Sequence, residues 1–321
     1  MIKIELLSDE TIPGVVECER ASIDKWYFYS SLSEKTESTF EELTPEQRWI
    51  HGGPTMDQTL LRKHWMELKR DIFDTYDIYV ALEKNRVVGF IGVQYGKEFL
   101  LGKHAYVDLL LVHPNSRRKG IARQLLQHVE NISKSNDCDN IFVFPDELDG
   151  SSGKFYLDLG FEIWEERYQI NIGTKNNPDL EKFLTPISEK RESNWNLIFG
   201  WHSTSPKVWL MLHSNFAEGI FDVQKTLLNY AFEKDPDVII GIIKWHRFFD
   251  FGSAYLWFTN KREDIDYYIT PRHFELIQHI GYKIGLKKVN IVFMENMLPY
   301  VSKWSISDTP QKIEPLLRKK L

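Results

Sequence analysis

The first half of the chain shows two spacings of apolar residues. Segments that alternate apolar and polar positions, or are apolar over a few residues, are typical of strands, whereas apolar residues at every third or fourth position are typical of helices. The predicted strands are IKIELL, the two arms of DIYVALEKNRVVGFIGVQYG around the turn EKNR, HAYVDLLLVHP, NIFVF and FEIWEERYQI. The predicted helices are SDETIPGVVECERASI, TMDQTLLRKHWMELKRDIF, the segment after Gly120 and GKFYLDLG.

Between the first two of these helices, residues 25–54 are aromatic and then polar. This pattern predicts a helix, a loop and a loop-rich approach to the next helix. The main elements of the first half follow the order β-α-α-β-β-β-α-β-α-β, which predicts an α/β layout with a mixed sheet.

The second half repeats part of this order. Residues 173–194 are polar and contain proline, which predicts a linker with a short helix. A predicted hairpin, a helix and a strand then follow in the same order as in the first half. The strand VIIGIIKWHRF matches VVGFIGVQYG, and GSAYLWFTN matches AYVDLLLV. The helix over 270–285 matches the helix after Gly120, and VNIVFM matches NIFVF. The other predicted elements are strands at WNLIFGW and VWLMLH, a helix near GIFDVQKTLLNYAFEK and a last helix or tail at PQKIEPLLRK. We expect a second copy of the same fold, with an unrelated α+β domain as the alternative.

Composition narrows the class of protein. A chain of 321 residues with 42% hydrophobic and 27% charged residues is typical of a globular protein of two domains. The net charge of -6 argues against a general nucleic-acid binder. Cys18 and Cys138 stand far apart, and no histidine pair has ligand spacing, so we expect no metal and a reduced, cytoplasmic protein. We see neither a signal peptide nor an apolar run that could span a membrane.

A basic turn, Arg117–Arg123, joins a predicted strand to a predicted helix. The first backbone N–H groups of a helix have no partner within it, and the helix dipole adds positive charge there, so this junction suits an anion. Gly120 removes the side chain where a ligand would approach the backbone, and Ala122 keeps the next approach small. Pyrophosphate held by successive amides fits best. The alternative is a helix start with a solvated basic face.

Two other phosphate-binding motifs fit less well. A Walker loop needs a glycine five residues before its Gly-Lys pair, but LDGSSGKF has Leu148 there and no serine or threonine after Lys154. A dinucleotide fingerprint needs three glycines, and the basic turn has only Gly120.

The stretch LLLVHPNSRRKGIARQLLQHVE resembles the acetyl-CoA-binding core of the GNAT N-acetyltransferase superfamily. The family pattern is Arg/Gln-x-x-Gly-x-Gly/Ala after a strand that ends in Val-x-Pro, and here it reads Arg117–Ala122 after Val112–Pro114. GKFYLDLGFEI follows at the right distance and resembles the Phe-Tyr-x-x-x-Gly-Phe segment of the family. The resemblance covers roughly residues 1–172.

The resemblance implies acetyl-CoA as cofactor and gives roles to single residues. The loop would bind the pyrophosphate, the main chain of the preceding strand would pair with the pantetheine arm, and an amide near Leu111 would lie close to the thioester oxygen. Many relatives have an asparagine at the position of Asp149, and its side chain contacts the cofactor arm. Because this chain has a carboxylate there, Asp149 is also a second candidate base. The implied cofactor-binding residues are Leu110, Leu111, Val112, Arg117, Arg118, Lys119, Gly120, Ile121, Ala122, Arg123 and Asp149.

Two residues are candidates for proton transfer. Tyr156, the tyrosine of the Phe-Tyr segment, would protonate the leaving thiolate, and its alternative role is a core aromatic. A primary amine has a pKa of roughly 10 and must lose a proton before it attacks. Asp108 is the candidate base, acting through water, because polyamine-type relatives carry an acidic residue there. Strand alternation predicts that Asp108 shares a face with Leu110 and Val112. The alternative is an ion pair with a nearby arginine.

These observations predict an α/β (α+β) fold: a GNAT-type mixed central sheet flanked by helices, followed by a second, smaller GNAT-like domain. The expected division is a GNAT domain at 1–172, a linker at 173–194 and a degenerate copy at 195–321, where Glu263, Asp264 and Asp266 would repel phosphate.

The expected function is acetyl transfer from acetyl-CoA to a primary amine by direct attack in a ternary complex. A non-catalytic CoA-binding or partner-docking module is the alternative. Expected partners are a small-molecule or peptide amine, with no nucleic acid and no membrane, and the chain would be a monomer or homodimer.

Overall fold

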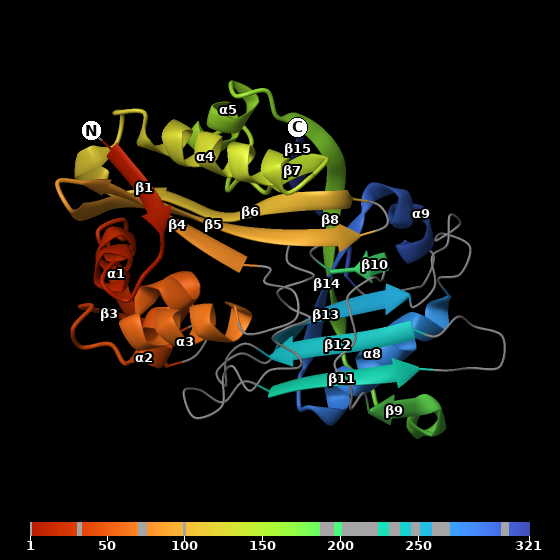
Figure 1. Cartoon of the computed structure of the whole chain (residues 1–321). Helices are drawn as coiled ribbons and strands as arrows, with labels where there is room; N and C mark the ends of the chain where they lie inside the picture. The colour runs from red at the N-terminus through yellow and green to blue at the C-terminus, as the bar shows by residue number, and fades with distance from the viewer. Residues whose placement is uncertain are drawn as a thin grey trace.

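The chain folds around one mixed sheet of 13 strands in the computed structural model (Figure 1). The described residues are 2–30, 34–69, 76–98, 101–186, 196–200, 224–230, 238–244, 251–258, 270–302 and 308–321. Helices flank the sheet, so the predicted fold class is confirmed. The order of its main path is β1-β4-β5-β6-β7-β15-β8-β14-β13-β12-β11-β9, and β10 pairs with β13.

The elements of the first half follow the predicted order with two additions within residues 25–54, a small hairpin and a helix where a loop-rich segment was predicted. They are β1 (Ile2–Leu6), α1 (Ile12–Arg20), β2 (Trp26–Tyr29), β3 (Lys35–Ser38), α2 (Pro45–Gly52), η1 (Gly53–Met56), α3 (Gln58–Lys69), β4 (Tyr76–Glu83), β5 (Arg86–Glu98), β6 (Gly102–Val112), η2 (Pro114–Ser116), α4 (Ile121–Ser135), β7 (Asn140–Val143), α5 (Ser151–Leu157) and β8 (Glu162–Gly173).

The hairpin β4–β5 is confirmed, and its turn shows why the sequence marks it. Lys84 and Asn85 have φ values of 50° and 61°. A two-residue turn with both central φ values positive matches the twist of antiparallel strands, and asparagine tolerates that conformation well.

The helix predicted at the start of residues 25–54 is wrong. Trp26–Tyr29 form β2, which pairs with β3. The backbone N–H of Tyr27 donates to Nε2 of His51 at 3.3 Å, and that of Tyr29 donates to Oε1 of Gln47 at 2.9 Å. Both acceptors belong to α2, so partners outside the segment favour a strand where local aromatic spacing indicated a helix.

Two hydrophobic clusters cover the two faces of the first half of the sheet. On one face, α4 buries the predicted residues Ile121, Leu125 and Val129, and Ile132 is partly buried beside them. On the other face, α1 and α3 pack on β4 and β5. Figure 1 shows α4 and α5 on one side of the strands and α1, α2 and α3 on the other.

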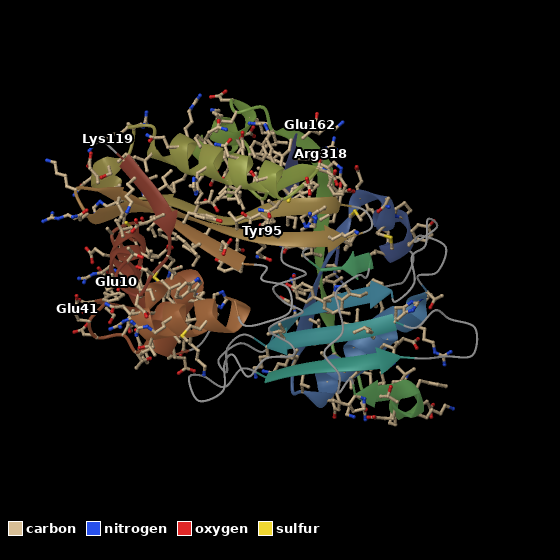
Figure 2. All side chains as sticks on the ribbon, viewed as in Figure 1. Glu10, Glu41, Tyr95, Lys119, Glu162 and Arg318 are labelled. Carbon is tan, nitrogen blue, oxygen red and sulfur yellow. The ribbon has the colours of Figure 1, made fainter. Side chains whose placement is uncertain are left out.

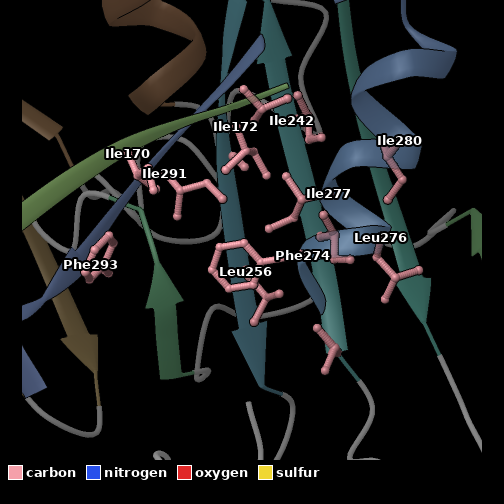
Figure 3. Close-up of a cluster of buried hydrophobic side chains, with 14 of the residues drawn as sticks. Ile170, Ile172, Ile242, Leu256, Phe274, Leu276, Ile277, Ile280, Ile291 and Phe293 are labelled. Carbon is pink, nitrogen blue, oxygen red and sulfur yellow. The ribbon is translucent and has the colours of Figure 1, made fainter. Parts of the chain in front are cut away.

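The second half repeats the central strand order of the first. β12 (Val238–Lys244) pairs antiparallel with β13 (Phe251–Phe258), and β13 pairs in parallel with β14 (Lys288–Met294). The helix α8 (Pro271–Lys283) connects the parallel strands, as α4 connects β6 to β7. The predicted hairpin, helix and last strand are therefore confirmed. Figure 3 shows Phe274, Ile277 and Ile280 of α8 in the core of this half.

Two predicted helices of the second half are wrong. The segment near GIFDVQKTLLNYAFEK contains β11 (Gln224–Tyr230), which lies between β12 and β9 (Leu184–Pro186). The last segment is β15 (Gln311–Lys320), and Pro315 within it would interrupt a helix. The remaining elements are η3 (Pro178–Phe183), β10 (Asn196–Phe199), η5 (Glu295–Met297) and α9 (Leu298–Val301). VWLMLH and the acidic residues 263, 264 and 266 lie outside the described residues.

β15 joins the two halves. It pairs antiparallel with β7 through Leu317–Lys320 and with β8 on its other edge. β8 in turn pairs with β14. The C-terminal strand therefore lies within the sheet of the first half, while β8 adds Ile170 and Ile172 to the core of the second half. The boundaries 172 and 195 stay predictions, but the sheet continues across them.

Candidate functional site

The two parallel strands at the centre of the first half separate partway along their length. β6 pairs with β7 only from His104 to Val107. It pairs with β5 as far as Val112. Among the described strands, nothing pairs with the β7-facing edge of β6 beyond Val107. The N–H and C=O groups of this edge could pair with an extended ligand, as a strand edge pairs with an added strand. Leu110, Leu111 and Val112 lie on this segment, in agreement with their predicted place.

A bulge corrects the predicted direction of Asp108. Gly92 pairs with Leu109 and Val93 pairs with Val107, so Asp108 has no counterpart on β5. The extra residue reverses the alternation along β6. Leu110 and Val112 pack on the α4 face, whereas Asp108 accepts a hydrogen bond at 3.3 Å from the hydroxyl of Tyr76, a member of the opposite cluster. The expectation that Asp108 shares a face with Leu110 and Val112 is therefore wrong.

The basic turn leaves its backbone open. Gly120 has a φ of 75° and precedes α4, which has no side-chain cap. An added Cβ at Gly120 would meet nothing within 4 Å. Arg118 also has a positive φ, 64°. Both residues are exposed, while Ile121 is buried and anchors the helix in the core.

The cations of the turn differ in their contacts. Nε of Arg117 donates to the carbonyl of Val112 at 3.1 Å. This bond ties the turn to the end of β6 and occupies a carbonyl that was expected to pair with the pantetheine arm. No ion pair of Arg118, Lys119 or Arg123 occurs within the described part of the chain. Figure 2 shows Lys119 at the N-terminal end of α4. An anion that binds at this turn would therefore meet uncapped backbone amides and positive charge.

Tyr156 lies on α5 and is almost fully buried, at 6% exposure. Its ring contacts Phe155 and Phe161, with centroids 5.2 and 5.4 Å away. Burial, and then the charges of Tyr106 and Asp146, raise the pKa of its hydroxyl. The phenol therefore keeps its proton at neutral pH. Asp149 is exposed in the loop before α5. That loop is held by the Leu148 N–H, which donates to Oε2 of Glu314 in β15 at 2.9 Å.

The opposite face holds a second group of polar residues that pattern analysis missed. Tyr76 is 3% exposed, and its hydroxyl approaches Asp108 across Gly92. A Cβ at Gly92 would lie 2.6 Å from that hydroxyl oxygen, so only glycine leaves room for it. Glu19 of α1 is also buried, at 8% exposure, and its charge raises the pKa of Tyr76, after burial and the charge of Asp108. The one available signal was Gly92, since a glycine inside a strand often marks a close approach.

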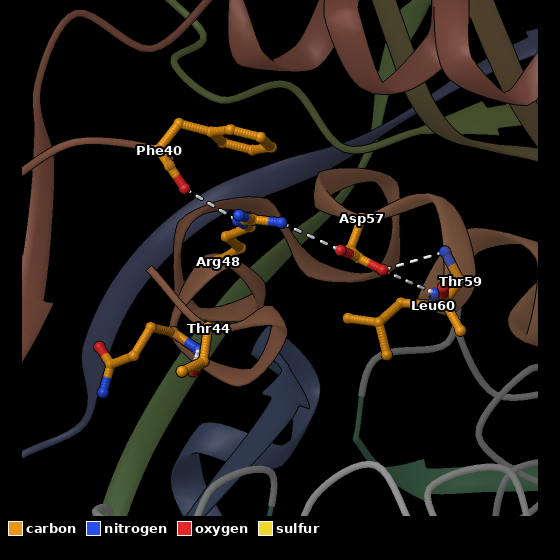
Figure 4. Close-up of polar contacts among 7 residues, drawn as sticks. Phe40, Thr44, Arg48, Asp57, Thr59 and Leu60 are labelled. Atoms are coloured by element: carbon orange, nitrogen blue, oxygen red, sulfur yellow. Dashed lines mark hydrogen bonds and ion pairs between the residues drawn. The ribbon is translucent and has the colours of Figure 1, made fainter. Parts of the chain in front are cut away.

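The segment that leads to α3 is fixed by polar contacts (Figure 4). Nη1 of Arg48 lies 3.2 Å from Oδ2 of Asp57, and Nε of Arg48 donates to the carbonyl of Phe40 at 3.0 Å. Oδ1 of Asp57 accepts the backbone N–H of Thr59 at 2.9 Å. These contacts hold α2, η1 and the start of α3 beside Glu19.

A cleft of about 850 Å³ lies next to the basic turn. Its lining comes from the start of α1, the β4–β5 turn and residues 113–116, and contains none of the predicted cofactor residues. In the described residues, no group of three histidine, cysteine or acidic side chains could hold a metal ion. None of the described helices is long and apolar enough to cross a membrane.

Comparisons with known proteins agree with this geometry. Residues 36–161 match the model of the Acetyltransferase (GNAT) family. The chain is 31% identical over 83 residues to the N-terminal acetyltransferase B complex catalytic subunit naa20 of Schizosaccharomyces pombe, which is 26% of this chain. It covers 42% of the length of that relative.

One solved structure shares the fold over the whole chain. A putative acetyltransferase from Pyrococcus horikoshii matches with a TM-score of 0.50 and 12% identity, over 100% of this chain and 89% of that chain. A tandem GNAT protein from the clavulanic acid biosynthesis pathway matches with a TM-score of 0.49 and 12% identity, over 100% and 98%. At 12% identity, the match to the Pyrococcus horikoshii structure supports the fold of the chain but not its activity or substrate. The family match, in contrast, falls on the segment with the open strand edge and the basic turn. Residues 36–161 of the chain are therefore similar to the Acetyltransferase (GNAT) family.

Proposed function

We propose that the chain transfers the acetyl group of acetyl-CoA to a primary amine by direct attack in a ternary complex. The observation that carries the proposal is the open edge of β6 beyond Val107, which leads to the uncapped turn at Gly120. An extended arm along that edge and a pyrophosphate at the turn would be held by one continuous stretch of backbone. The family match supports the same reading.

The cofactor residues fit their proposed roles on the observed geometry. Acetyl-CoA supplies an acetyl group activated as a thioester. Amides from Arg118 to Arg123 would bind its pyrophosphate, since those of the first turn of α4 lack a side-chain cap. Leu110 would offer main-chain groups to its arm, whereas those of Leu111 face β5, as do those of His113, whose N–H donates to Val88. The carbonyl of Val112 already accepts from Arg117, so only its N–H is left for that role on this edge.

The two candidates for proton transfer, Tyr156 and Asp108, lie on opposite faces of the sheet. Tyr156 belongs to the α4-side cluster, and Asp108 is hydrogen bonded to Tyr76 on the other. We propose Tyr156 as the acid that stabilises the leaving sulfur. Asp108 is a base on the acceptor side, and Asp149 is left as an exposed loop residue. The amine would thus arrive from the α1–α3 face.

The proposal includes a small-molecule or peptide amine as acceptor. The Schizosaccharomyces pombe relative is named an N-terminal acetyltransferase, which supports testing a peptide N-terminus beside alkyl amines. A cytoplasmic monomer or homodimer is also proposed. The two buried cysteines, which form no disulfide, fit a reducing compartment.

Release of free thiol from acetyl-CoA tests the activity. We expect release to depend on an added amine, and mass spectrometry to find the amine heavier by one acetyl group. A panel should include alkyl amines, an amino sugar, a polyamine and short peptides. Tight CoA binding without amine-dependent release for any of them would favour a non-catalytic CoA-binding or partner-docking module.

A further inference from the structure

Glu19 is a buried carboxylate that the proposed mechanism has not used. It lies in the last turn of α1, where the negative end of the helix dipole disfavours a second negative charge. Oε2 of Glu19 is buried and has no hydrogen-bond partner among the described residues. The Thr55 hydroxyl, which donates to the carbonyl of Gly52 at 3.1 Å, acts to lower the pKa of Glu19. The carboxylate thus keeps one oxygen available.

Among the residues that the structure describes, no cation forms an ion pair with Glu19. Burial is the main cause that raises the pKa of Glu19, to about 7, and no positive group contributes to the shift. The arginines of α1, α2 and α3 contact other acids. These pairs are Arg20 with Glu41 at 2.5 Å, Arg48 with Asp57 at 3.2 Å and Arg62 with Asp9 at 2.6 Å. The other titratable groups of the packed elements include Glu17, Cys18, Glu46, His51, Lys63, His64, Tyr76 and Asp108.

Glu19 lies beside the candidate acceptor face. An added Cβ at Gly52 would be 3.2 Å from Oε1 of Glu19, so a side chain there would crowd the carboxylate. Its charge acts on Tyr76, whose hydroxyl is bonded to Asp108 at the bulge. The ring of His64 packs edge-on against Tyr76, with centroids 5.7 Å apart. Two carboxylates from different elements therefore act on one phenol.

This arrangement suits a primary ammonium group. An ammonium has three hydrogen-bond donors and no acceptor. Its positive charge would offset the unfavourable free energy of burying the ionised carboxylate. An amine acceptor arrives protonated at neutral pH. We propose that Glu19 binds the ammonium group of the acceptor and takes its proton, so that the chain selects cationic primary amines. This inference rests on the proposed function.

The proton and electron balance is simple. The ionised carboxylate of Glu19 accepts one proton from the ammonium, which frees the nitrogen lone pair. That lone pair forms the new bond to the acetyl carbon as the carbon–sulfur bond breaks. The sulfur leaves with the bonding electrons next to the Tyr156 hydroxyl and is protonated to the free thiol. The nitrogen gives up two protons and the sulfur takes one, so one proton in total passes to solvent. Asp108, the base proposed above, takes the second proton of the nitrogen through water, and Tyr76 is a positioning residue on the acceptor side.

Glu19→Gln is the matched test, because glutamine keeps the shape and removes the charge. At pH 8 we expect kcat/KM for the amine to fall roughly 10²-fold, with the Kd of acetyl-CoA unchanged. The wild-type kcat/KM should rise with pH through about 7, as Glu19 ionises. The Glu19→Gln variant should not show this rise in kcat/KM. Glu17→Gln, at an exposed position of the same helix, is the control and should behave as wild type.

A second readout does not depend on turnover. A raised pKa means that the folded state binds more protons than the unfolded state between pH 4.5 and about 7, so stability falls as pH rises through that window. We expect the thermal midpoint of wild type to fall more than that of Glu19→Gln between pH 4.5 and 8. At pH 8, n-butylammonium chloride should raise the midpoint of wild type and not that of the variant, relative to equal sodium chloride.

The outcomes separate the two proposals. An active wild type with an equally active Glu19→Gln and an equal n-butylammonium response would overturn the role of Glu19 and leave acetyl transfer intact. A wild type that acetylates no amine would instead overturn the proposed function, and the role of Glu19 as a base with it.

Discussion

Tyr156→Phe is expected to lower kcat by roughly 10²–10⁴ while the affinity for acetyl-CoA changes little. The phenylalanine ring keeps the contacts with Phe155 and Phe161, so the fold should be retained. Burial raises the pKa of the hydroxyl, which makes it a weak acid as well as a protonated one. We therefore expect it to donate a hydrogen bond to the sulfur as charge builds while the bond is breaking.

Tyr95→Phe is the matched control. Tyr95 (Figure 2) packs against the same hydrophobic cluster, and burial raises its pKa to about 12. The groups that act on its hydroxyl include Tyr79 and Asp77 and none of the proposed site residues. Steady-state kinetics and a CoA titration should be run on both variants. If Tyr156→Phe lost affinity and kept kcat, its hydroxyl would serve only to hold the cofactor.

Removal of residues 308–321 is expected to unfold the first half of the chain. This truncation deletes β15, and with it Leu316 and Leu317, which are both 0% exposed. It also breaks the pairing with β7 and β8 and the ion pairs Arg318–Glu162 at 2.5 Å and Lys319–Glu130 at 2.6 Å. Loss of two buried leucines costs roughly 4–10 kcal/mol, and a whole domain is stable by about 5–15 kcal/mol.

Urea denaturation followed by circular dichroism measures this effect. Leu317→Ala provides a graded variant that should lose roughly 2–5 kcal/mol, and Lys320→Ala, at an exposed position, should lose almost nothing. A truncated chain with the urea midpoint of wild type would show that β15 is dispensable. For the same reason, a deletion of residues 195–321 would not leave the first half intact.

The sequence reveals those features of the fold whose causes are local. The Lys84–Asn85 turn, the amphipathic α4 and the glycine at the start of α4 each depend on neighbours within a few residues. β15 was missed because its partners, β7 and β8, lie more than a hundred residues earlier in the sequence. β2 was missed because its amides are satisfied by His51 and Gln47.

In the candidate site, too, the sequence predicts what depends on near neighbours and misses what depends on distant ones. The basic turn and Tyr156 belong to short contiguous motifs, so they can be found by inspection. The face of Asp108 was mistaken because one bulged residue reverses the alternation on which the prediction was based. Glu19 carries no motif at all. Its importance comes from burial by η1 and from the nearby Tyr76, both of which only the folded chain reveals.

Titration calorimetry with CoA tests the central claim, that the turn at Gly120 is the one cofactor site of the chain. We predict one equivalent per chain, and at least tenfold weaker binding in Gly120→Glu, roughly 1.4 kcal/mol or more. Gly285→Glu is the matched control, because Gly285 shares the φ of 75° and an added Cβ there also meets nothing within 4 Å. Two equivalents per chain, or unchanged affinity in a folded Gly120→Glu variant, would contradict the account.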